Sequence, residues 1–251
     1  MLSKVYIQRM EGEIASDACY VAWRGFQRKG VPTTFFQWPE LMAGEVSLTR
    51  DTLVVGGMIE VFHAMKTLGI QPPPPLNLPE CLSAYRGRRI WNSTFGELHR
   101  QFRAGAGQSV FVKPLTAAKA FTGYVIAGLD DFEPTIHLPA HTQLQCSEIV
   151  EFTSEWRYFV HRQQIVGLGF YAGDVFRHPD STVVRGAIDL YEAEAPVAYG
   201  MDFGVTTDGR TLLVEVNDAF ALGCYGLGAV EYASMLEARW LEVVGKQPET
   251  P

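Results

Sequence analysis

A hairpin pattern late in the chain constrains the fold more than any other feature. Residues 202–217 read DFGVTTDGRTLLVEVN, with a tight turn at Asp208-Gly209 between alternating apolar residues. An Asp-Gly pair in this setting is a strong hairpin signal because the turn requires positive φ angles. Glu215 and Asn217 are two residues apart on the returning strand, so we expect their side chains to leave the same face of it.

Asp202 lies at the end of an apolar run and approaches Glu215 and Asn217 if the two strands pair in register, while Val214 and Val216 point to the opposite face. Two carboxylates and a carboxamide form a set of hard oxygen ligands that suits Mg²⁺, which usually shares its coordination shell with substrate phosphates. The alternative is a solvated hairpin face without a ligand. The E-x-N triplet alone does not exclude it, so the other segments have to decide.

Composition narrows the class of protein. The chain has 251 residues and a net charge of −7, so its surface as a whole does not attract nucleic acid, although a local basic groove is compatible with this balance. No apolar run approaches the roughly 18 residues of a membrane span, and the N-terminus has no apolar leader. Four scattered cysteines lack zinc-ligand spacing. We expect a cytoplasmic protein with reduced, mostly buried thiols.

The first 76 residues alternate strand and helix patterns, which predicts a small parallel α/β unit. A helix begins after Ser16, a good N-cap residue, and stops at Gly30. Gly56-Gly57 follows a strand, but it lacks the G-x-G-x-x-G pattern of a phosphate loop, so we interpret it as a tight turn. The predicted strands cover 4–8, 31–36 and 52–55, and the predicted helices 16–28 and 58–68.

Four consecutive prolines, residues 72–75, predict a stiff extended connector and a domain boundary. We predict three parts: 1–76, 77–147 and 148–251. In the second part, Thr94 and Glu97 form a capping-box pattern that opens a helix over 95–103. The basic cluster at residues 86–89 either faces a phosphate or is simply surface.

Lys113 ends an apolar strand, residues 109–112, and its ammonium group needs an anion or water there. The loop that follows, residues 116–123, is rich in small residues. Such a loop either folds over phosphates with its backbone N–H groups or makes an ordinary hairpin.

The rest of the chain predicts an antiparallel meander with strands at 144–150, 156–160 and 165–171. Glu148 lies near the end of the first of these strands. Residues 173–186, which include Arg177 and Arg185, have little periodicity and predict a mobile loop. A helix over 229–244 carries one apolar stripe.

Taken in order, these features resemble the ATP-grasp superfamily. The motifs are Lys113 in a strand-end VKP, Glu148 and Glu155 seven residues apart, Arg157, and an aspartate followed by E-x-N on a late hairpin. Each motif is short, but the ordered set is specific. The chain is similar to compact ATP-grasp ligases of the RimK-related clade, roughly over residues 88–226. The first 76 residues resemble the α/β domain that precedes the grasp, so the resemblance implies an α/β fold with a grasp core of two α+β subdomains with antiparallel sheets.

The resemblance also implies a role for each matching residue. Lys113 and Arg89 would contact the ATP phosphates, the hinge Glu148-Ile149-Val150-Glu151 would bind the adenine, and Glu155 would bind the ribose. Asp202, Glu215 and Asn217 would bind Mg²⁺, and Arg157 or Arg185 would stabilise the reacting phosphoryl group. The loop 116–123 would close over the triphosphate.

Two departures from the family pattern bear on the site. A lysine common before the VKP strand is absent, and Arg88 or Arg89 is the candidate to replace it. Gly200 stands two residues before Asp202, where the family often has arginine, so Arg157, Arg177 or Arg185 would have to supply that charge. We expect the substrate pocket to include residues 218–226.

The implied reaction is Mg-ATP-dependent ligation of a carboxylate to an amine through an acyl phosphate. Its substrates would be small molecules or peptides, and family resemblance makes a homodimer a possible assembly. A small-molecule kinase and a non-catalytic nucleotide-binding module are the alternatives.

Overall fold

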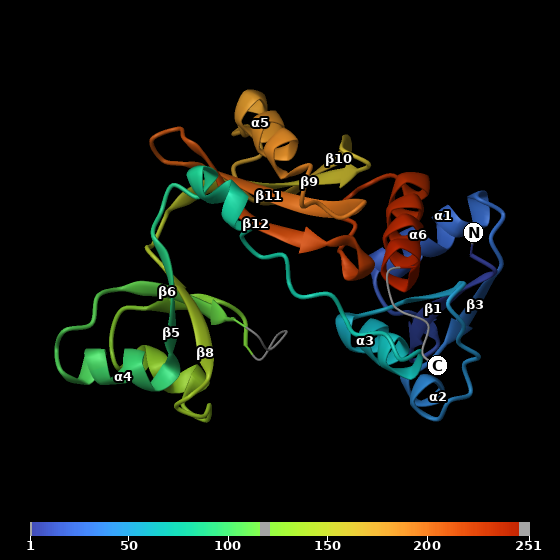
Figure 1. Ribbon diagram of the computed structural model, residues 1–251, viewed down its shortest axis with the longest axis horizontal. Coiled ribbons are helices and arrows are strands. Elements are labelled where there is room, and N and C mark those ends of the chain that lie inside the picture. Colours follow the sequence, from blue (N-terminus) through green and yellow to red (C-terminus); the bar gives the residue numbers. More distant parts are fainter. Residues whose placement is uncertain (1, 116–120, 246–251) are drawn as a thin grey trace. The chain divides into compact units, whose positions relative to one another are not determined.

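The computed structural model describes residues 2–115 and 121–245 (Figure 1). The chain forms two compact units, one from residues 1–85 together with 153–251 and the other from residues 86–152. Three four-stranded sheets organise them: an N-terminal sheet, a middle sheet and a C-terminal sheet. Each predicted part holds one sheet, although the first and third parts share a unit.

The N-terminal sheet is built around β1 (Lys4–Met10), which pairs in parallel with β3 (Thr33–Phe36) and β4 (Thr52–Val55). This confirms the predicted parallel unit. Its helices are α1 (Asp17–Arg28) and α3 (Met58–Thr67), and the Ser16 hydroxyl caps α1 by accepting from the Cys19 N–H. The sequence patterns missed two short elements, β2 (Glu13–Ile14) and α2 (Trp38–Met42), because neither is long enough to show a period.

The C-terminal sheet has the strand order β10-β9-β11-β12. The predicted hairpin is present: β11 (Ala198–Thr206) and β12 (Thr211–Asp218) pair antiparallel, and Gly209 adopts the positive φ that the turn requires. A register shift follows the Asp202–Glu215 pair, because Phe203 pairs with Leu213. Val214 is therefore the extra, half-buried residue of a β-bulge, whereas Val216 is buried as predicted.

Two predictions for this half of the chain are wrong. Residues 173–186 are not one loop, because β10 (Gln164–Gly173) ends there and α5 (Ser181–Tyr191) begins, capped by Asp180, whose carboxylate accepts from the Thr182 N–H. The apolar stripe of α5 starts at Val184 and continues past the predicted loop, so its period is visible only in a longer window. Similarly, β8 (Gln143–Ser147) stops before Glu148.

The two faces of the C-terminal sheet are packed differently. Alternate residues of β9 (Phe152–His161) and β11, such as Trp156 and Met201, form one core with α5, which covers that face (Figure 1). On the opposite face, Phe159 and Ala198 join a second core with the N-terminal sheet, α1 and the C-terminal helix α6 (Ala229–Gly245).

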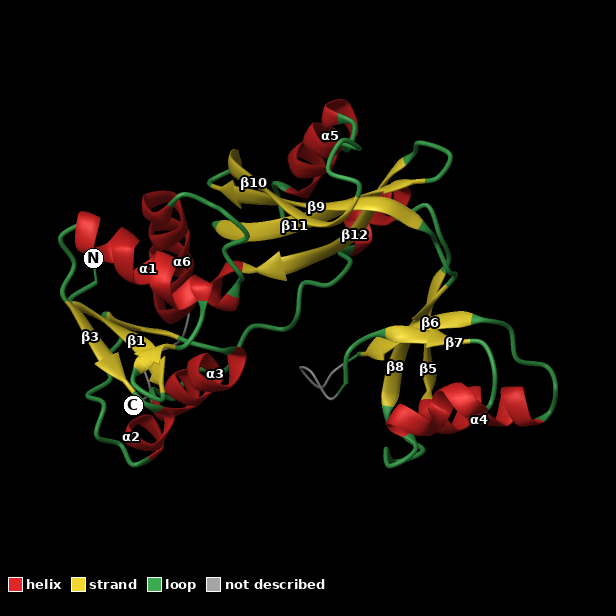
Figure 2. Cartoon of the chain, turned by 180° about the vertical axis from the view of Figure 1, so that it is seen from behind, coloured by secondary structure: helices red, strands yellow, loops and turns green. Residues whose placement is uncertain are grey.

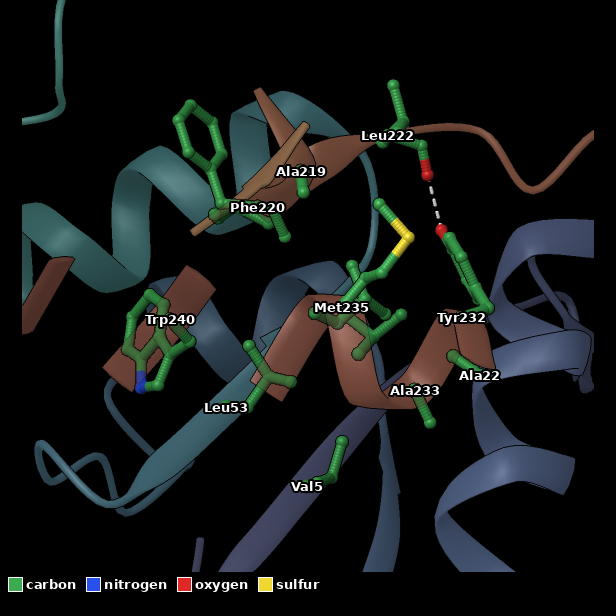
Figure 3. Close-up of a cluster of buried hydrophobic side chains, with 14 of the residues drawn as sticks. Val5, Ala22, Leu53, Ala219, Phe220, Leu222, Tyr232, Ala233, Met235 and Trp240 are labelled. Atoms are coloured by element: carbon green, nitrogen blue, oxygen red, sulfur yellow. Dashed lines mark hydrogen bonds between the residues drawn. The ribbon is translucent and has the colours of Figure 1, made fainter. Parts of the chain in front are cut away.

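Figure 3 shows part of this second core, in which the Tyr232 hydroxyl of α6 donates to the Leu222 carbonyl. The segment that follows β12, including the 3-10 helix η3 (Ala219–Ala221), is thereby fastened to α6.

The middle unit has the strand order β5-β8-β6-β7, with every neighbour antiparallel. Its helix α4 (Phe95–Arg103) lies along one face of the sheet (Figure 2) and begins with the predicted capping box of Thr94 and Glu97. The remaining elements of this unit are β5 (Ile90–Thr94), β6 (Val110–Pro114), β7 (Tyr124–Ile126) and the 3-10 helix η2 (Asp130–Thr135); η1 (Glu80–Tyr85) precedes the unit.

Three of the four cysteines are buried: Cys19, Cys146 and Cys224. Burial raises the pKa of the Cys146 thiol to about 11, so this thiol stays protonated at neutral pH. Within the described ranges, no helix combines the length and apolar character needed to cross a membrane.

The contact between α1 and α6 depends on the missing side chain of Gly25. A Cβ at this position would lie 1.9 Å from the Ala229 carbonyl oxygen, which is backbone and cannot rotate away. We expect Gly25→Ala to lower the free energy of unfolding by about 1–3 kcal/mol, the usual cost of overpacking a core. Urea unfolding measures this. Gly128→Ala is the control, because its Cβ would meet only Asp131 Oδ2, at 4.0 Å. Equal stability of the two variants would contradict this account of the contact.

Candidate nucleotide and metal site

Five of the predicted site residues lie on one face of the C-terminal sheet. Glu155 and Arg157 alternate along β9, and the pairing of β11 with β12 sets Asp202 opposite Glu215 and Gly200 opposite Asn217. Because side chains two residues apart share a face of a strand, three strands bring this polar group together on the side away from α5. The predicted convergence of Asp202 with the E-x-N pair is therefore present in the structure.

Arg157 and Asp202 form a buried two-pronged ion pair. The Arg157 Nε donates to Asp202 Oδ1 at 2.7 Å and its Nη2 to Oδ2 at 2.6 Å, and the two side chains are only 7% and 9% exposed. Burial by itself lowers the pKa of Arg157, but the hydrogen bonds and the charge of Asp202 outweigh it, so this pKa is raised. The guanidinium thus stays charged inside the protein.

Asn217 joins the two carboxylates. Its Nδ2 donates to Asp202 Oδ2 and to Glu215 Oε1, both at 3.0 Å. The carboxylates therefore point at one place, which the amide N–H groups occupy. Turning the amide about its last side-chain torsion would present Oδ1 instead, and three oxygen ligands would then face a cation. The donor set fits Mg²⁺.

This cluster holds only two carboxylates, and its third ligand would be an amide. Among the described residues, no group of three or more His, Cys, Asp or Glu side chains is arranged to hold a metal ion. Any metal in the described part would therefore need Asn217 or a substrate oxygen to complete its shell.

A second buried network holds the end of β12 in place. Arg239 of α6 donates to both oxygens of Asp218, at 2.7 and 2.5 Å, and to Glu242 at 2.7 Å. Glu242 also accepts from the Val197 N–H, directly before β11. Asp218 is the residue after Asn217, so α6 fixes both strands that carry the candidate ligands.

Glycines make room for the Arg157 side chain and its neighbours. A Cβ on Gly200 would lie 3.2 Å from Arg157 Cδ, so the arginine passes over the position where related chains often have an arginine of their own. A Cβ on Gly169 would lie 2.7 Å from the backbone oxygen of Tyr225. Tyr225 consequently lies against β10, with its ring centroid 4.9 Å from the guanidinium carbon of Arg157.

Tyr171 completes this group of side chains. Its ring centroid is 5.1 Å from that of Tyr225 and 5.8 Å from the guanidinium carbon of Arg157. Hydrogen bonding with Tyr225 raises the pKa of Tyr171, so the phenol is protonated at neutral pH. The sequence analysis included Tyr225 only as part of a pocket segment and missed Tyr171, because neither belongs to a charged motif.

The middle unit carries the other predicted contacts. Lys113 lies on β6 opposite Gln145 of β8, and it alternates with Val110 and Val112, which enter the core under α4. Lys113 therefore lies on the face of the middle sheet that α4 leaves open.

Arg89 and Glu148 contact each other at the end of β5 and β8. Glu148 Oε2 accepts from the Arg89 N–H at 3.0 Å, and the Arg89 Nε lies 3.6 Å from Oε1. Both side chains are more than half exposed, so the pair adds little stability. The hinge residues Ile149, Val150 and Glu151 follow in a segment without regular structure. The predicted phosphate loop, 116–123, lies mostly outside the described residues.

Arg185 is not near the polar cluster. It is an exposed residue of α5, and α5 packs on the face of the C-terminal sheet opposite Arg157 and Asp202. Arg177 is also exposed, and its carbonyl accepts from Ser154 and Trp156. Of the three arginines considered from the sequence, only Arg157 joins the candidate ligands.

Residues 85–235 match the profile of a known family, an ATP-grasp domain that is the second family of its clade. The chain belongs to the ATP-grasp family. The match covers more than half of the sequence, and it confirms the resemblance found from the motifs. No curated protein matches the chain.

Solved ATP-grasp structures share the fold over nearly the whole chain. A RimK domain ATP-grasp protein from Sphaerobacter thermophilus DSM 20745 has a TM-score of 0.60 at 14% identity, covering 95% of this chain and 99% of that one. The D-cycloserine synthetase DcsG has a TM-score of 0.61 at 13% identity, with 94% and 99% covered. D-alanine–D-alanine ligase from Bacillus anthracis, complexed with ATP, has a TM-score of 0.54 at 14% identity, with 97% and 98% covered. The predicted mixed α/β grasp fold is thus confirmed.

The buried pair makes a stability prediction. Arg157→Met should lower the free energy of unfolding by about 3–5 kcal/mol, because Asp202 would be left buried without its counter-charge. Urea unfolding measures this, and adding Asp202→Asn should recover a large part of the loss. The exposed Arg210–Asp208 pair is the matched control, and Arg210→Ala should change stability by less than about 1 kcal/mol. Similar losses in both single variants would show that burial does not set the difference.

Proposed function

We propose that this ATP-grasp protein is a Mg-ATP-dependent carboxylate–amine ligase that works through an acyl phosphate. The observation that carries the proposal is the convergence of Arg157, Asp202, Glu215 and Asn217 on one sheet face within an ATP-grasp domain. Solved relatives of the fold include a ligase and a synthetase, one of them bound to ATP, which supports a nucleotide-dependent joining reaction.

The balance of bonds fits this set of residues. A carboxylate oxygen of the first substrate attacks the γ-phosphorus, the bond to the bridging oxygen of ADP breaks, and an acyl phosphate forms. The amine of the second substrate then attacks the acyl carbon, loses a proton, and phosphate leaves. No protein nucleophile is needed, because phosphoryl transfer depends on positioning and on cations near the developing charge.

Each residue then has a role. Asp202, Glu215 and Asn217 would hold the metal, which when bound neutralises charge on the β- and γ-phosphates. Lys113 would contact the phosphates from β6, with Arg89 as a second cation. The hinge from Glu148 to Glu151 would bind the adenine and Glu155 the ribose.

Arg157 is our choice for the arginine that stabilises the acyl phosphate. It is held by Asp202 beside the proposed metal ligands, and it passes over Gly200, where the family often has the corresponding arginine. Arg185 is on the opposite face of the sheet. Turnover lost in Arg185→Ala but kept in Arg157→Lys would transfer the role to Arg185.

The proposal is tested with amino acids offered pairwise with Mg-ATP, following release of ADP and phosphate and the product masses. Lys113→Ala and Glu215→Ala should each lower turnover at least about 100-fold, the usual effect of removing a charge-stabilising group. Circular dichroism should show that both variants stay folded. Lys66→Ala and Glu192→Ala remove exposed residues of the same types from α3 and the end of α5, and they should keep wild-type turnover.

Hydroxylamine separates this ligase from a small-molecule kinase. It traps an acyl phosphate as a hydroxamate but does not react with a stable phosphoester. ADP release without hydroxamate, for every carboxylate that supports it, would favour the kinase. Tight ATP binding with background ADP release throughout would instead indicate a nucleotide-binding module.

A further inference from the structure

The order of strands gives the candidate site a direction. From one side of the C-terminal sheet to the other, β12 and β11 carry the proposed metal ligands, β9 carries Arg157, and β10 carries Tyr171. Arg157 pairs with Gly169 of β10, so no side chain of that residue separates the guanidinium from the tyrosines. The transferred phosphoryl group would lie between the metal and Arg157, which leaves the β10 side for the organic substrate.

The β10 side presents two partly exposed aromatic rings. Tyr171 is 50% exposed and Tyr225 is 40% exposed, although both lie within 6 Å of a buried guanidinium. Tyrosine rings combine a large apolar surface with a hydroxyl, and pairs of them are well suited to hold an apolar group beside a polar one. Their exposed faces lie next to the group that would meet the reacting carboxylate.

The backbone around Tyr225 is unusual in the same place. Tyr225 has a φ of +38°, in the region that favours glycine, and Gly226 follows with a φ of +85°. Side chains held in such conformations cluster at binding sites, because the fold must over-determine them. Here Gly169 permits the close approach of the Tyr225 backbone, and the Tyr232 hydroxyl fastens Leu222 nearby.

The surrounding segments carry no charge. Neither β10, residues 164–173, nor the segment 219–230 contains an acidic or basic residue. Arg157 therefore offers a cation for one carboxylate, while these two segments offer none for a second. An apolar lining with one buried cation selects a monocarboxylate with a neutral body.

We infer that Tyr171 and Tyr225 form the specificity surface for the carboxylate substrate, and that this substrate is a neutral amino acid or peptide end with an apolar or aromatic side chain. Its carboxylate lies at Arg157 and its side chain lies against the two rings. The inference rests on the proposed ligase function and adds to it a substrate class and two specificity-determining residues.

The test uses the full chain with Mg-ATP and hydroxylamine as the acceptor, and measures hydroxamate formed from a panel of amino acids. The panel contains apolar, aromatic, acidic and basic side chains. The wild-type protein should use apolar and aromatic members best. Tyr171→Ala and Tyr225→Ala should raise the KM for these carboxylates at least about tenfold, the scale set by losing apolar pocket contacts. The KM for ATP and the kcat at saturating carboxylate should stay close to wild type.

Two further variants separate binding from folding. Tyr171→Phe and Tyr225→Phe keep the rings and should keep the KM within about threefold, because the contact is mainly apolar. Phe170→Ala is the matched control: it removes a ring of similar exposure from the next position of β10, where it contacts Trp156 instead of Arg157, and it should leave the carboxylate KM unchanged.

The outcomes are distinct. Hydroxamate formation with an unchanged carboxylate KM in both alanine variants, or with acidic amino acids preferred, overturns the inference while the ligase function stands. A rise in the KM for ATP equal to that for the carboxylate also overturns it. Absence of hydroxamate with every carboxylate and the wild-type protein overturns both.

Discussion

The candidate site depends on a buried ion pair between Arg157 and Asp202. Two charges that are each more than nine-tenths buried are stable only if their hydrogen bonds are made, and this pair makes two direct bonds and gains a third from Asn217. That geometry requires β9, β11 and β12 to be neighbours in this register. The polar cluster is therefore part of the folded core and cannot form on the hairpin alone.

A second arginine–carboxylate network keeps those strands in position. Asp218 follows Asn217 directly, and its ion pair with Arg239 links the end of β12 to α6. Since α6 also packs on α1 and the N-terminal sheet, the core shown in Figure 3 supports the candidate ligands through covalent neighbours and buried hydrogen bonds. Such support holds side chains in a geometry ready for binding before any ligand arrives.

Glycines decide which side chains can meet on this face. Gly200 leaves the space over which Arg157 passes, and Gly169 lets the Tyr225 backbone approach β10. A charge that the family often places on β11 is in this chain supplied from the adjacent strand. The positive group thus comes close to Asp202 although the local sequence before Asp202 departs from the family pattern.

The sequence by itself determined the local elements and the ordered motifs: the Asp-Gly hairpin, the Ser16 and Thr94 caps, the parallel N-terminal unit and the membership in the ATP-grasp family. These follow from short-range periodicity and turn chemistry, which are written in neighbouring residues. Only the tertiary structure decided that Arg157 and not Arg185 joins Asp202, that Val214 is a bulge, and that Tyr171 and Tyr225 flank the guanidinium. Those facts depend on which strands are adjacent and on which face α5 packs, and such long-range pairings are not contained in the spacing of residues along the chain.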